Sequence, residues 1–478
     1  MTPAPPIPEE LWNTIPLAAR AALVVLISGY EARIAALEAQ NAKLEARVQE
    51  LEARLNQNSS NSSKPPSSDG PHVKPAPPRK PSGKRRGGQP GHPKHSRSQL
   101  PPDRIIELRA ESCRRCGERL SGDDPDPLVH QVIEIPPPKP DVTEYRRHRR
   151  CCPHCHRISC PPLPTEARSG YGPGVQAIAA LLSGAYRIGK RGVARLLREL
   201  LGVPISPAAV CKLQHRTAEA LGPAAAEARA YLIGRKANVD ETGWVEGRKL
   251  AWLWTAVASG VTVFVLRPSR SRAVLGDLIP GQPGLLTTDR FSVYDHLDKD
   301  AHQVCWSHLR RDFQAMIDRK DEGRPIGEGL LRCANRMLKH WQRVRDGTLG
   351  RKAFQKGPLV KAQAMFDRLV AQGPHCGQKI RHACYELSQR GSTLWWFAWV
   401  EGVEPTNNAA ERALRHAVCW RKMSYGTDST RGSRFVERIL TVVESCRQQG
   451  RNLLAFLKKT IQAARTGSPS PSLLPVAA

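Results

Sequence analysis

Three carboxylates in the second half of the chain are of the residue type that divalent-metal chemistry requires. They are Asp240 in "KANVDETGW", Asp289 in "GLLTTDRFSVYD" and Glu411 in "EPTNNAAERAL". Attack on a phosphodiester assisted by two Mg²⁺ ions about 3.5–4 Å apart needs several hard oxygen ligands that converge on one point. The three acids are therefore candidate catalytic ligands of Mg²⁺ or Mn²⁺, provided that the fold brings them together.

The segments around the two aspartates predict the elements that would position them. They are rich in β-branched and aromatic residues, and Ser259-Gly260 is typical of a hairpin turn. The predicted elements are strands at 236–244, 249–259 and 261–266, a helix at 271–278, a strand within 284–295 that ends at Asp289, and a strand at 302–308. This order predicts an α/β fold with an RNase H-like core, in which Asp240 and Asp289 lie side by side. An aspartate that ends a strand is by itself usually a turn residue, so the prediction rests on the pair.

Glu411 has two candidate roles. Asn408, Ala409, Ala410 and Glu411 have the spacing of a capping box, in which the Asn408 side chain closes the N-terminus of a helix. One turn into that helix is also where an RNase H-like core would direct a third carboxylate at the two aspartates. One carboxylate does not serve both roles well. We predict that Asn408 caps the helix and that Glu411 binds metal.

Two C-x-x-C pairs form a second metal-binding pattern. In a reducing cytosol such pairs bind metal rather than form disulfides, and two pairs make a tetrahedral Zn²⁺ site that leaves no position for a substrate. We therefore predict a structural Zn²⁺ held by Cys113, Cys116, Cys152 and Cys155. The segments "LVHQVIEIP" and "DVTEYRRHRRCC" predict two strands that bring the pairs together. The neighbours that leave the last two ligands open are Cys151, His154, His156 and Cys160.

A seven-residue repeat runs through residues 23–55. The d positions are Leu23, Tyr30, Leu37, Leu44 and Leu51, and the a positions are Ile27, Ile34, Asn41, Val48 and Leu55. Leu at d, with β-branched residues and one Asn at a, favours a parallel two-stranded coiled coil. Arg33 and Arg47 at g positions can meet Glu38 and Glu52 of a partner chain. A single amphipathic helix packed on its own protein is the alternative, but the charges and the lone Asn favour a homodimer or a higher oligomer.

The net charge of +29 and the pI near 10.1 favour a polyanionic partner. Nucleic acid is a commoner partner of this kind than an anionic membrane. Residues 57–104 are rich in Ser, Pro, Gly and basic residues and are predicted to be a disordered linker. In it, Lys84, Arg85 and Arg86 are candidate contacts to DNA phosphates, with a plain solubilising linker as the alternative.

Helical patterns within 170–232 suggest a helix-turn-helix. "RGVARLLRELLG" is followed by Ser206 as a cap and Pro207 at the first helical position. The second helix would present Lys212, Gln214, His215 and Arg216 to DNA. An ordinary helical pair is the alternative.

About 120 residues separate Asp289 from Glu411, and 318–402 is predicted to be a helical insertion before the catalytic helix. Trp395, Trp396 and Trp399 are predicted to pack this insertion against the core rather than stack on unpaired bases. Candidate phosphate contacts beyond the catalytic helix are Arg421, Lys422, Arg431 and Arg434.

No apolar run reaches the ~18 residues that span a bilayer. Acidic Glu9 and Glu10 precede the apolar stretch at 21–30, where a signal peptide has a basic region. We expect a cytoplasmic protein without a membrane partner, associated with the nucleoid when it is bound to DNA.

In order along nearly the whole chain, these segments resemble the bacterial DDE transposases of insertion sequence sixty-six. The shared motifs are "NSSNSSKPPSSD", "RRGGQPGH", "VDETGW", "TTDRFSVY", "CWSHLRRDF", "TNNAAERALR", "RKMSYGTDSTRGSRF" and "NLLAFL", together with the coiled coil and the cysteine pairs. The resemblance implies that Asp240, Asp289 and Glu411 are the metal-binding acids. It also implies cleavage at terminal inverted repeats, joining of the exposed 3′-OH to target DNA, and an element-encoded helper protein. The chain departs from the family at His416, where Pro is usual, and at Arg290, where Gly is common.

The predicted domains account for nearly the whole chain. They are a coiled coil (20–56), a basic linker (57–104), a zinc-binding module (105–165), a helical DNA-binding region (170–232), the core in two parts (236–317 and 403–465) and the helical insertion (318–402). Two other functions are compatible with parts of this pattern. A stand-alone nuclease of the same fold would not need the N-terminal modules, and a non-enzymatic zinc-containing regulator would not need three acids. We therefore predict a DNA transposase.

Overall fold

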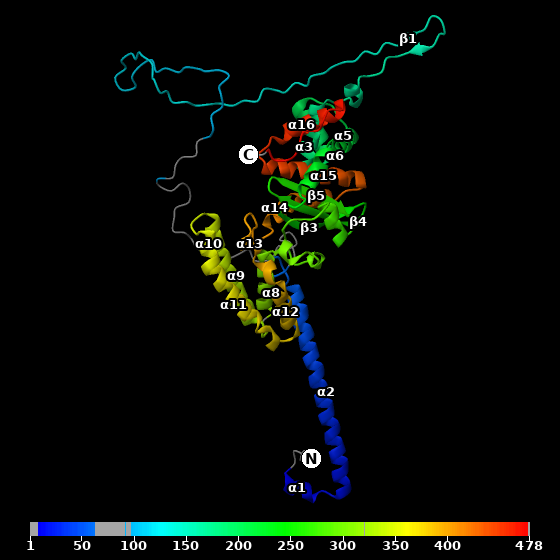
Figure 1. The fold of residues 1–478 in the computed structure, drawn as a ribbon, viewed down its shortest axis with the longest axis vertical. Coiled ribbons are helices and arrows are strands. Elements are labelled where there is room, and N and C mark those ends of the chain that lie inside the picture. The colour runs from blue at the N-terminus through cyan, green and yellow to red at the C-terminus, as the bar shows by residue number, and fades with distance from the viewer. Residues whose placement is uncertain (1–7, 63–90, 92–96, 320, 477–478) are drawn as a thin grey trace. The chain divides into compact units, whose positions relative to one another are not determined.

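The computed structural model describes residues 8–62, 91, 97–319 and 321–476 (Figure 1). Lys84, Arg85, Arg86 and most of the predicted linker lie outside the described residues. The chain divides into two compact units. The larger unit comprises Met1–Val73, Pro164–Ile188 and Lys212–Ala478, and the smaller unit comprises Lys74–Leu163 and Gly189–Cys211. None of the described helices has the length and apolar character needed to cross a membrane.

The heptad repeat forms one long helix. The N-terminal helices are α1 (Glu9–Thr14) and α2 (Leu17–Leu55). Along α2 the large apolar side chains at a and d positions from Tyr30 to Leu51 are between 44% and 61% exposed. Arg47 and Arg54 both pair with Glu50 of the same helix, at 2.7 Å and 2.8 Å. The predicted helix is confirmed, and its pairing with a second chain stays a prediction.

A five-stranded mixed sheet lies at the centre of the larger unit (Figure 1). Its strands are β3 (Ala237–Glu246), β4 (Lys249–Ala258), β5 (Val261–Arg267), β6 (Leu286–Thr288) and β7 (His302–Val304), in the order β5-β4-β3-β6-β7. The first three are antiparallel neighbours, while β6 runs parallel to β3 and β7 parallel to β6. The expected α/β class is confirmed, and the predicted strand order along the chain is present.

Helices cover both faces of this sheet. The helices in the core on one face are α3 (Pro173–Gly184), α6 (Gly222–Tyr231), α7 (Arg272–Leu278) and α16 (Leu453–Thr466), and α14 (Asn408–Ser424) covers the other. Side chains alternate between the faces along a strand. In β3, Val239 therefore lies on the first face and Trp244 on the α14 face. By the same alternation Asp240 belongs to the α14 face and Glu241 to the opposite one.

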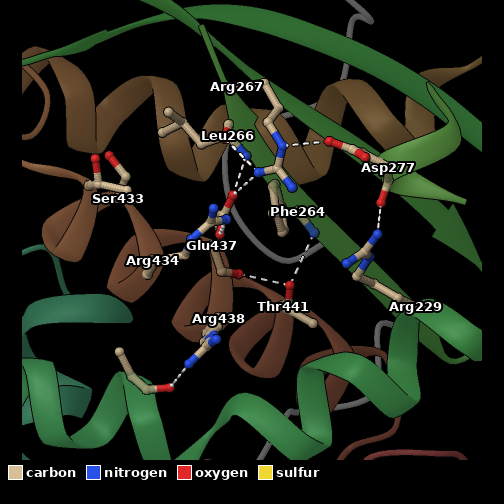
Figure 2. A network of polar contacts seen from close by, with 12 residues as sticks. Arg229, Phe264, Leu266, Arg267, Asp277, Ser433, Arg434, Glu437, Arg438 and Thr441 are labelled. Carbon is tan, nitrogen blue, oxygen red and sulfur yellow. Dashed lines mark hydrogen bonds and ion pairs between the residues drawn. The ribbon is translucent and has the colours of Figure 1, made fainter. Parts of the chain in front are cut away.

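Helix α15 (Thr430–Gln448) covers the outer edge of the sheet, along β5 (Figure 2). The backbone N–H of Leu266 donates to Glu437 Oε1 (2.6 Å), and the N–H of Phe264 donates to Thr441 Oγ1 (3.0 Å). The N–H of Thr262 donates to Ser445 Oγ (3.0 Å). Four residues of helix advance about 6 Å and two residues of strand about 6.6 Å, so acceptors at i, i+4 and i+8 match alternate strand residues. This edge is therefore closed to pairing with another chain.

The segment between β7 and α14 forms a helical cluster with its own core. Its helices are α8 (Trp306–Asp318), α9 (Arg324–Arg345), α10 (Arg351–Phe354), α11 (Val360–Val370), α12 (Gln378–Arg390) and α13 (Trp396–Trp399). The predicted helices are thus present. The packing role is confirmed for Trp395, which is buried, and for Trp396, whose indole N–H donates to the Lys299 carbonyl (2.8 Å). It is wrong for Trp399, which is 54% exposed.

The predicted helix-turn-helix segment forms α4 (Lys190–Leu201) and α5 (Pro207–Ala220). Ser206 caps α5 by accepting the N–H of Ala209 (3.1 Å), and Pro207 is its first residue, as predicted. Lys212 and Arg216 are exposed. Presentation of Gln214 to DNA is wrong, because this side chain is buried and donates to Ser183 Oγ (2.8 Å). The boundary between the two units falls within α5, so the arrangement of α4 and α5 as a helix-turn-helix stays a prediction.

The strands predicted between the two cysteine pairs are largely wrong. Residues 128–149 form no strand, and only β1 (Arg150–Cys151) pairs, with β2 (Ile158–Ser159). Apolar side chains that would share one face of such a strand, Ile133 and Ile135, are 49% and 80% exposed. Alternation alone does not make a strand, because the ladder also needs a partner and a covered face.

The edge contacts of α15 predict a specific loss of stability. Thr441→Val keeps the side-chain volume but leaves the buried N–H of Phe264 without its acceptor. We expect the free energy of unfolding in urea, followed by tryptophan fluorescence, to fall by about 1–3 kcal/mol. The control Thr466→Val changes an exposed threonine of α16 and should have little effect. Equal stability of both variants would contradict this role of α15.

Candidate active site

The register of β3 and β6 determines where the two aspartates lie. In this parallel pair Asn238 is opposite Thr287. Asp240 and Asp289 each come two residues later, so they lie at the same level on two neighbouring segments of the sheet. Such segments are about 4.8 Å apart. The sheet thus brings together the two aspartates that the sequence predicted as partners.

The neighbouring acids affect the pKa of Asp240. Burial raises its pKa well above the usual range, and the charges of Glu241, Asp289 and Glu411 raise it further, in that order. Only the backbone N–H of Glu241, which donates to Asp240 Oδ1 (3.0 Å), acts in the opposite direction. The site therefore has an excess of negative charge at Asp240, which a bound cation would relieve.

Helix α14 brings Glu411 to this site, but its N-terminus is built differently from the predicted capping box. The cap residue is Asn407, whose carbonyl accepts the N–H groups of Ala410 (2.9 Å) and Glu411 (3.2 Å). No side chain caps this helix. Side-chain capping by Asn408 is therefore wrong, and its Oδ1 instead accepts the Ser307 hydroxyl at 3.4 Å.

Cys305 explains why the helix begins there. The buried thiol accepts the backbone N–H of Asn407 (3.3 Å), and the N–H of Cys305 donates to the carbonyl of Thr288 (2.8 Å). The next N–H, of Trp306, donates to the Pro405 carbonyl (2.8 Å). These bonds join the residue before Asp289, the start of α8 and the approach to α14. They therefore fix the origin of the Glu411 helix relative to the end of β6.

Basic groups of α8 face Glu411. His308 Nε2 lies 3.8 Å and Arg311 Nη2 lies 3.9 Å from Glu411 Oε1. Both distances exceed those of hydrogen bonds, so neither group binds the carboxylate tightly. Burial lowers the pKa of His308, while the charges of Asp289 and Glu411 oppose that shift. On the same helix Asp312 pairs with Arg290 (3.0 Å), the residue that follows Asp289.

Glu241, beside Asp240, anchors the segment that follows Asp289. Its Oε2 accepts the Tyr294 hydroxyl (2.6 Å), and its Oε1 accepts the Arg270 guanidinium (2.9 Å from Nε). The same guanidinium stacks over the ring of Phe291, 3.6 Å from its centroid. Burial raises the pKa of Glu241, and the charge of Asp289 adds to the shift, whereas Tyr294 and Arg270 lower it.

Sequence reasoning gave no role to Glu241, His308 or Arg311. Two signals were present: a second acid directly after Asp240 in "VDETGW", and a histidine and an arginine three residues apart in "CWSHLRRDF". Residues three apart share one face of a helix. The face of α8 that carries His308 and Arg311 could not be placed at the site from the sequence, because no local pattern tells where α8 packs.

The carboxylate oxygens suit Mg²⁺ or Mn²⁺, and the uncompensated charge at Asp240 suits any divalent cation. Among the residues that the structure describes, however, no three His, Cys, Asp or Glu side chains are arranged so as to hold one metal ion. The Mg²⁺ and Zn²⁺ sites therefore remain predictions.

The two C-x-x-C pairs have the same local geometry. Cys113 donates its N–H to Glu118 (2.8 Å) and accepts the N–H of Gly117 (2.9 Å), and Cys152 bonds likewise to Arg157 (3.0 Å) and His156 (2.9 Å). Both turns use positive φ, at Gly117 and at His156. Backbone N–H groups, first those of Cys116 and Cys155, lower the pKa of Cys113 and Cys152 respectively. Each turn thus favours a thiolate, the form that binds Zn²⁺.

Two of the four basic residues predicted to contact phosphates are bonded within the protein. Arg421 donates to the carbonyl of Gly243 on β3, and Arg434 pairs with Glu437 (2.7 Å). Lys422 and Arg431 are exposed. The DNA contacts of all four remain predictions.

His416, where the family usually has Pro, is buried. Its Nε2 lies 2.8 Å from the Gly184 carbonyl and its Nδ1 lies 3.0 Å from Arg447 Nη1. The imidazole therefore links α14 to both α3 and α15, which a proline ring at this position would not do.

Known proteins were compared with the chain. Residues 168–434 match the family model described as "Transposase IS66 family", and residues 9–98 match "Family of unknown function (DUF6444)". Two proteins of Sinorhizobium fredii are similar. "Uncharacterized protein y4qI" is 24% identical over 254 residues, which are 47% of this chain and 45% of that protein. "Uncharacterized protein y4hP" is 25% identical over 388 residues, which are 72% of this chain and 69% of that protein. The chain thus spans less than half the length of the first relative, and the transposase match includes all three candidate acids.

His302 of β7 predicts a pH dependence of stability. This buried imidazole lies 2.8 Å from the Thr288 hydroxyl, and burial lowers its pKa to about 4. The unfolded value is about 6.5, so protonation favours the unfolded chain. The neutral His302 therefore contributes fully to the free energy of unfolding above pH 6.5. This contribution is lost as the pH falls from 6.5 to about 4. Between pH 7 and 4 the wild type should lose about 3 kcal/mol more than His302→Gln.

The measurement is urea unfolding across this pH range. His382→Gln, which changes an exposed histidine of α12, is the control and should follow the wild-type curve. Parallel curves for the wild type and His302→Gln would contradict the effect of burial.

Proposed function

Because the chain belongs to the IS66 family of transposases, we propose that it cleaves DNA at the terminal inverted repeats of its insertion sequence. Cleavage proceeds by two-metal phosphoryl transfer, and the exposed 3′-OH is then joined to target DNA. The observation that carries this proposal is the register of β3 and β6, which puts Asp240 and Asp289 at the same level of the sheet, with Glu411 near enough for its charge to raise the pKa of Asp240. One carboxylate within β3, one directly after β6 and one on α14 supply the oxygen ligands that a pair of divalent ions needs.

The sheet supports the same proposal. Three antiparallel strands followed by two parallel ones, in the order β5-β4-β3-β6-β7, agree with an RNase H-like core. In such a core the first and fourth strands are neighbours, and here these are β3 and β6. A catalytic helix packed on the same face as Asp240 supplies Glu411.

Each residue of the site has a distinct task in this mechanism. When bound, two Mg²⁺ or Mn²⁺ ions would activate the attacking oxygen and stabilise the leaving one. Asp240, Asp289 and Glu411 would hold them. Cys305 and Asn407 keep the start of α14 beside the end of β6. Arg311 attracts Glu411 without binding it tightly, and His308 lies 3.8 Å from the same oxygen, so the Glu411 oxygens stay available to a metal.

The exposed apolar side chains at the a and d positions of α2 support assembly through a coiled coil. Apolar a and d side chains stay about half exposed along the described helix, and a second copy of the same helix would cover them. Cleavage at two element ends requires at least two catalytic centres, which a dimer supplies. A helper protein encoded by the element remains part of the proposal.

The paired cysteine turns support a structural Zn²⁺. Each turn has two thiols at its tip and backbone N–H groups that favour the thiolate. One Zn²⁺ on both turns would connect Cys113 and Cys116 with Cys152 and Cys155 and so order the segment between them.

Substitution of the three acids tests the catalytic proposal. Asp240→Asn, Asp289→Asn and Glu411→Gln should each lower cleavage of labelled inverted-repeat DNA in Mg²⁺ by at least about a thousandfold, because several kcal/mol of transition-state stabilisation are lost. DNA binding should persist.

Glu401→Gln is the matched control, because it changes an exposed carboxylate on the approach to α14. Wild-type cleavage by Glu411→Gln, with loss in Glu401→Gln, would overturn the assignment of the third acid. Cleavage without joining in the wild type would instead indicate a nuclease.

Metal analysis tests the zinc proposal without an activity measurement. The purified protein should contain one Zn²⁺ per chain, and Cys113→Ser or Cys152→Ser should lose it. Cys419→Ser changes an exposed cysteine outside the smaller unit and should retain it. Zinc content that is unchanged in both ligand variants would overturn the proposed ligands.

A further inference from the structure

The turn between β3 and β4 and the loop after α14 form an exposed surface with apolar side chains. Val245 and Leu250, a cross-strand pair, are 37% and 65% exposed. Met423, in the last turn of α14, is 63% exposed, and Tyr425, directly after that helix, is 84% exposed. We name residues 245–250 and 423–428 the hairpin–loop surface.

The two halves of this surface are held together. The N–H of Thr427 donates to the Val245 carbonyl (2.9 Å), and the N–H of Gly247 donates to the Thr427 carbonyl (2.8 Å). The Trp244 indole N–H also donates to Thr427 Oγ1 (3.2 Å). A Cβ at Gly426 would overlap the carbonyl oxygen of Val245, so only glycine permits this approach. The surface is therefore preorganised.

One residue of this surface has a left-handed backbone conformation although its side chain is not buried. Tyr425 ends α14 with φ +59°. Arg248 also has a positive φ, +66°, but the two-residue turn between β3 and β4 accounts for it. Glycine is the favoured residue at such a helix end, and other residues are strained there. The Tyr425 ring recovers nothing through burial, because it is largely exposed. A strained, exposed aromatic residue is expected where a ligand uses it.

The hairpin–loop surface and the residues directly beside it carry more basic than acidic groups. Arg248 and Lys249 are exposed on the surface, and Lys422 and Arg431 are exposed next to it. The acidic residues are Glu246 and Asp428. The carboxylate of Glu246 accepts the hydroxyls of Thr430 (3.3 Å) and Ser433 at the start of α15, so it is bonded within the protein. Basic side chains around an exposed aromatic ring match a nucleic-acid strand, because phosphates bind the cations and bases stack on the ring.

We propose that the hairpin–loop surface binds unpaired DNA beside the cleavage position, with Tyr425 stacked on a base and the basic side chains on phosphates. The inference rests on the proposed function for the location of cleavage. Val245 follows Asp240 by five residues along β3, or about 17 Å.

Site-specific photocrosslinking tests this contact directly. The full chain carries p-benzoylphenylalanine in place of Tyr425 and is irradiated, without divalent metal, with a labelled duplex that has a single-stranded overhang. The control has the same replacement at Tyr385, an exposed tyrosine of α12. We expect a crosslink to the overhang from position 425 and none from position 385. Absence of the DNA crosslink, or a crosslink from position 425 to another protein chain instead, overturns the proposal.

Two substitutions separate stacking from backbone strain. Tyr425→Gly relieves the left-handed strain and should raise the melting temperature, yet it should weaken binding of the overhang DNA by about five- to a hundredfold, the range for one base–aromatic stack. Tyr425→Phe keeps the ring and should bind as the wild type does. Unchanged binding by Tyr425→Gly contradicts the stacking role. Because no metal is present, these results are independent of the outcome for the acid variants.

Discussion

Mutual repulsion of carboxylates is the constraint on which the rest of this site depends. The charges of Glu241, Asp289 and Glu411 all oppose ionisation of the half-buried Asp240. Such an arrangement persists only when other contacts determine it. The register of β3 and β6 supplies one of these contacts, and the link from Thr288 through Cys305 to Asn407 supplies another. A bound pair of cations would turn this electrostatic cost into binding free energy.

Contacts on both sides of the sheet keep the repelling groups in place. On the face opposite α14, Arg270 and Tyr294 neutralise Glu241 and so fix the segment after Asp289. At the outer edge, α15 satisfies the N–H groups of β5 and thereby closes the sheet. The same helix begins next to the hairpin–loop surface, because hydroxyls of its first turn bind Glu246. The three candidate acids and the proposed DNA contact are thus both supported by the sheet and the helices packed on it.

Local sequence predicted those elements whose determinants are local. Ser206 and Pro207 start α5 as expected, because capping and proline preference act within one turn. The strands around Asp240 and Asp289 followed from β-branched and aromatic runs. Side-chain capping by Asn408 failed, since Cys305, about a hundred residues earlier, holds Asn407 and moves the helix start. Gln214 failed for a similar reason, because its partner Ser183 belongs to another helix.

The same distinction explains what was missed in the site. Asp240, Asp289 and Glu411 were predicted as site residues from residue type and from their places relative to particular elements, and their role as metal ligands stays a prediction. His308 and Arg311 gain their meaning only from the position of α8 beside Glu411, and Glu241 only from its partners Arg270 and Tyr294. Each of these contacts joins residues of two different elements. A local sequence pattern therefore does not predict them.

Anomalous diffraction from crystals soaked with Mn²⁺ is the most direct measurement of whether the three acids form one metal site. We expect anomalous density between the carboxylates of Asp240 and Asp289, with Glu411 turned away from Arg311 and toward the ion. Density elsewhere in the protein, or an acid cluster that stays without Mn²⁺ at saturating concentration, would contradict it.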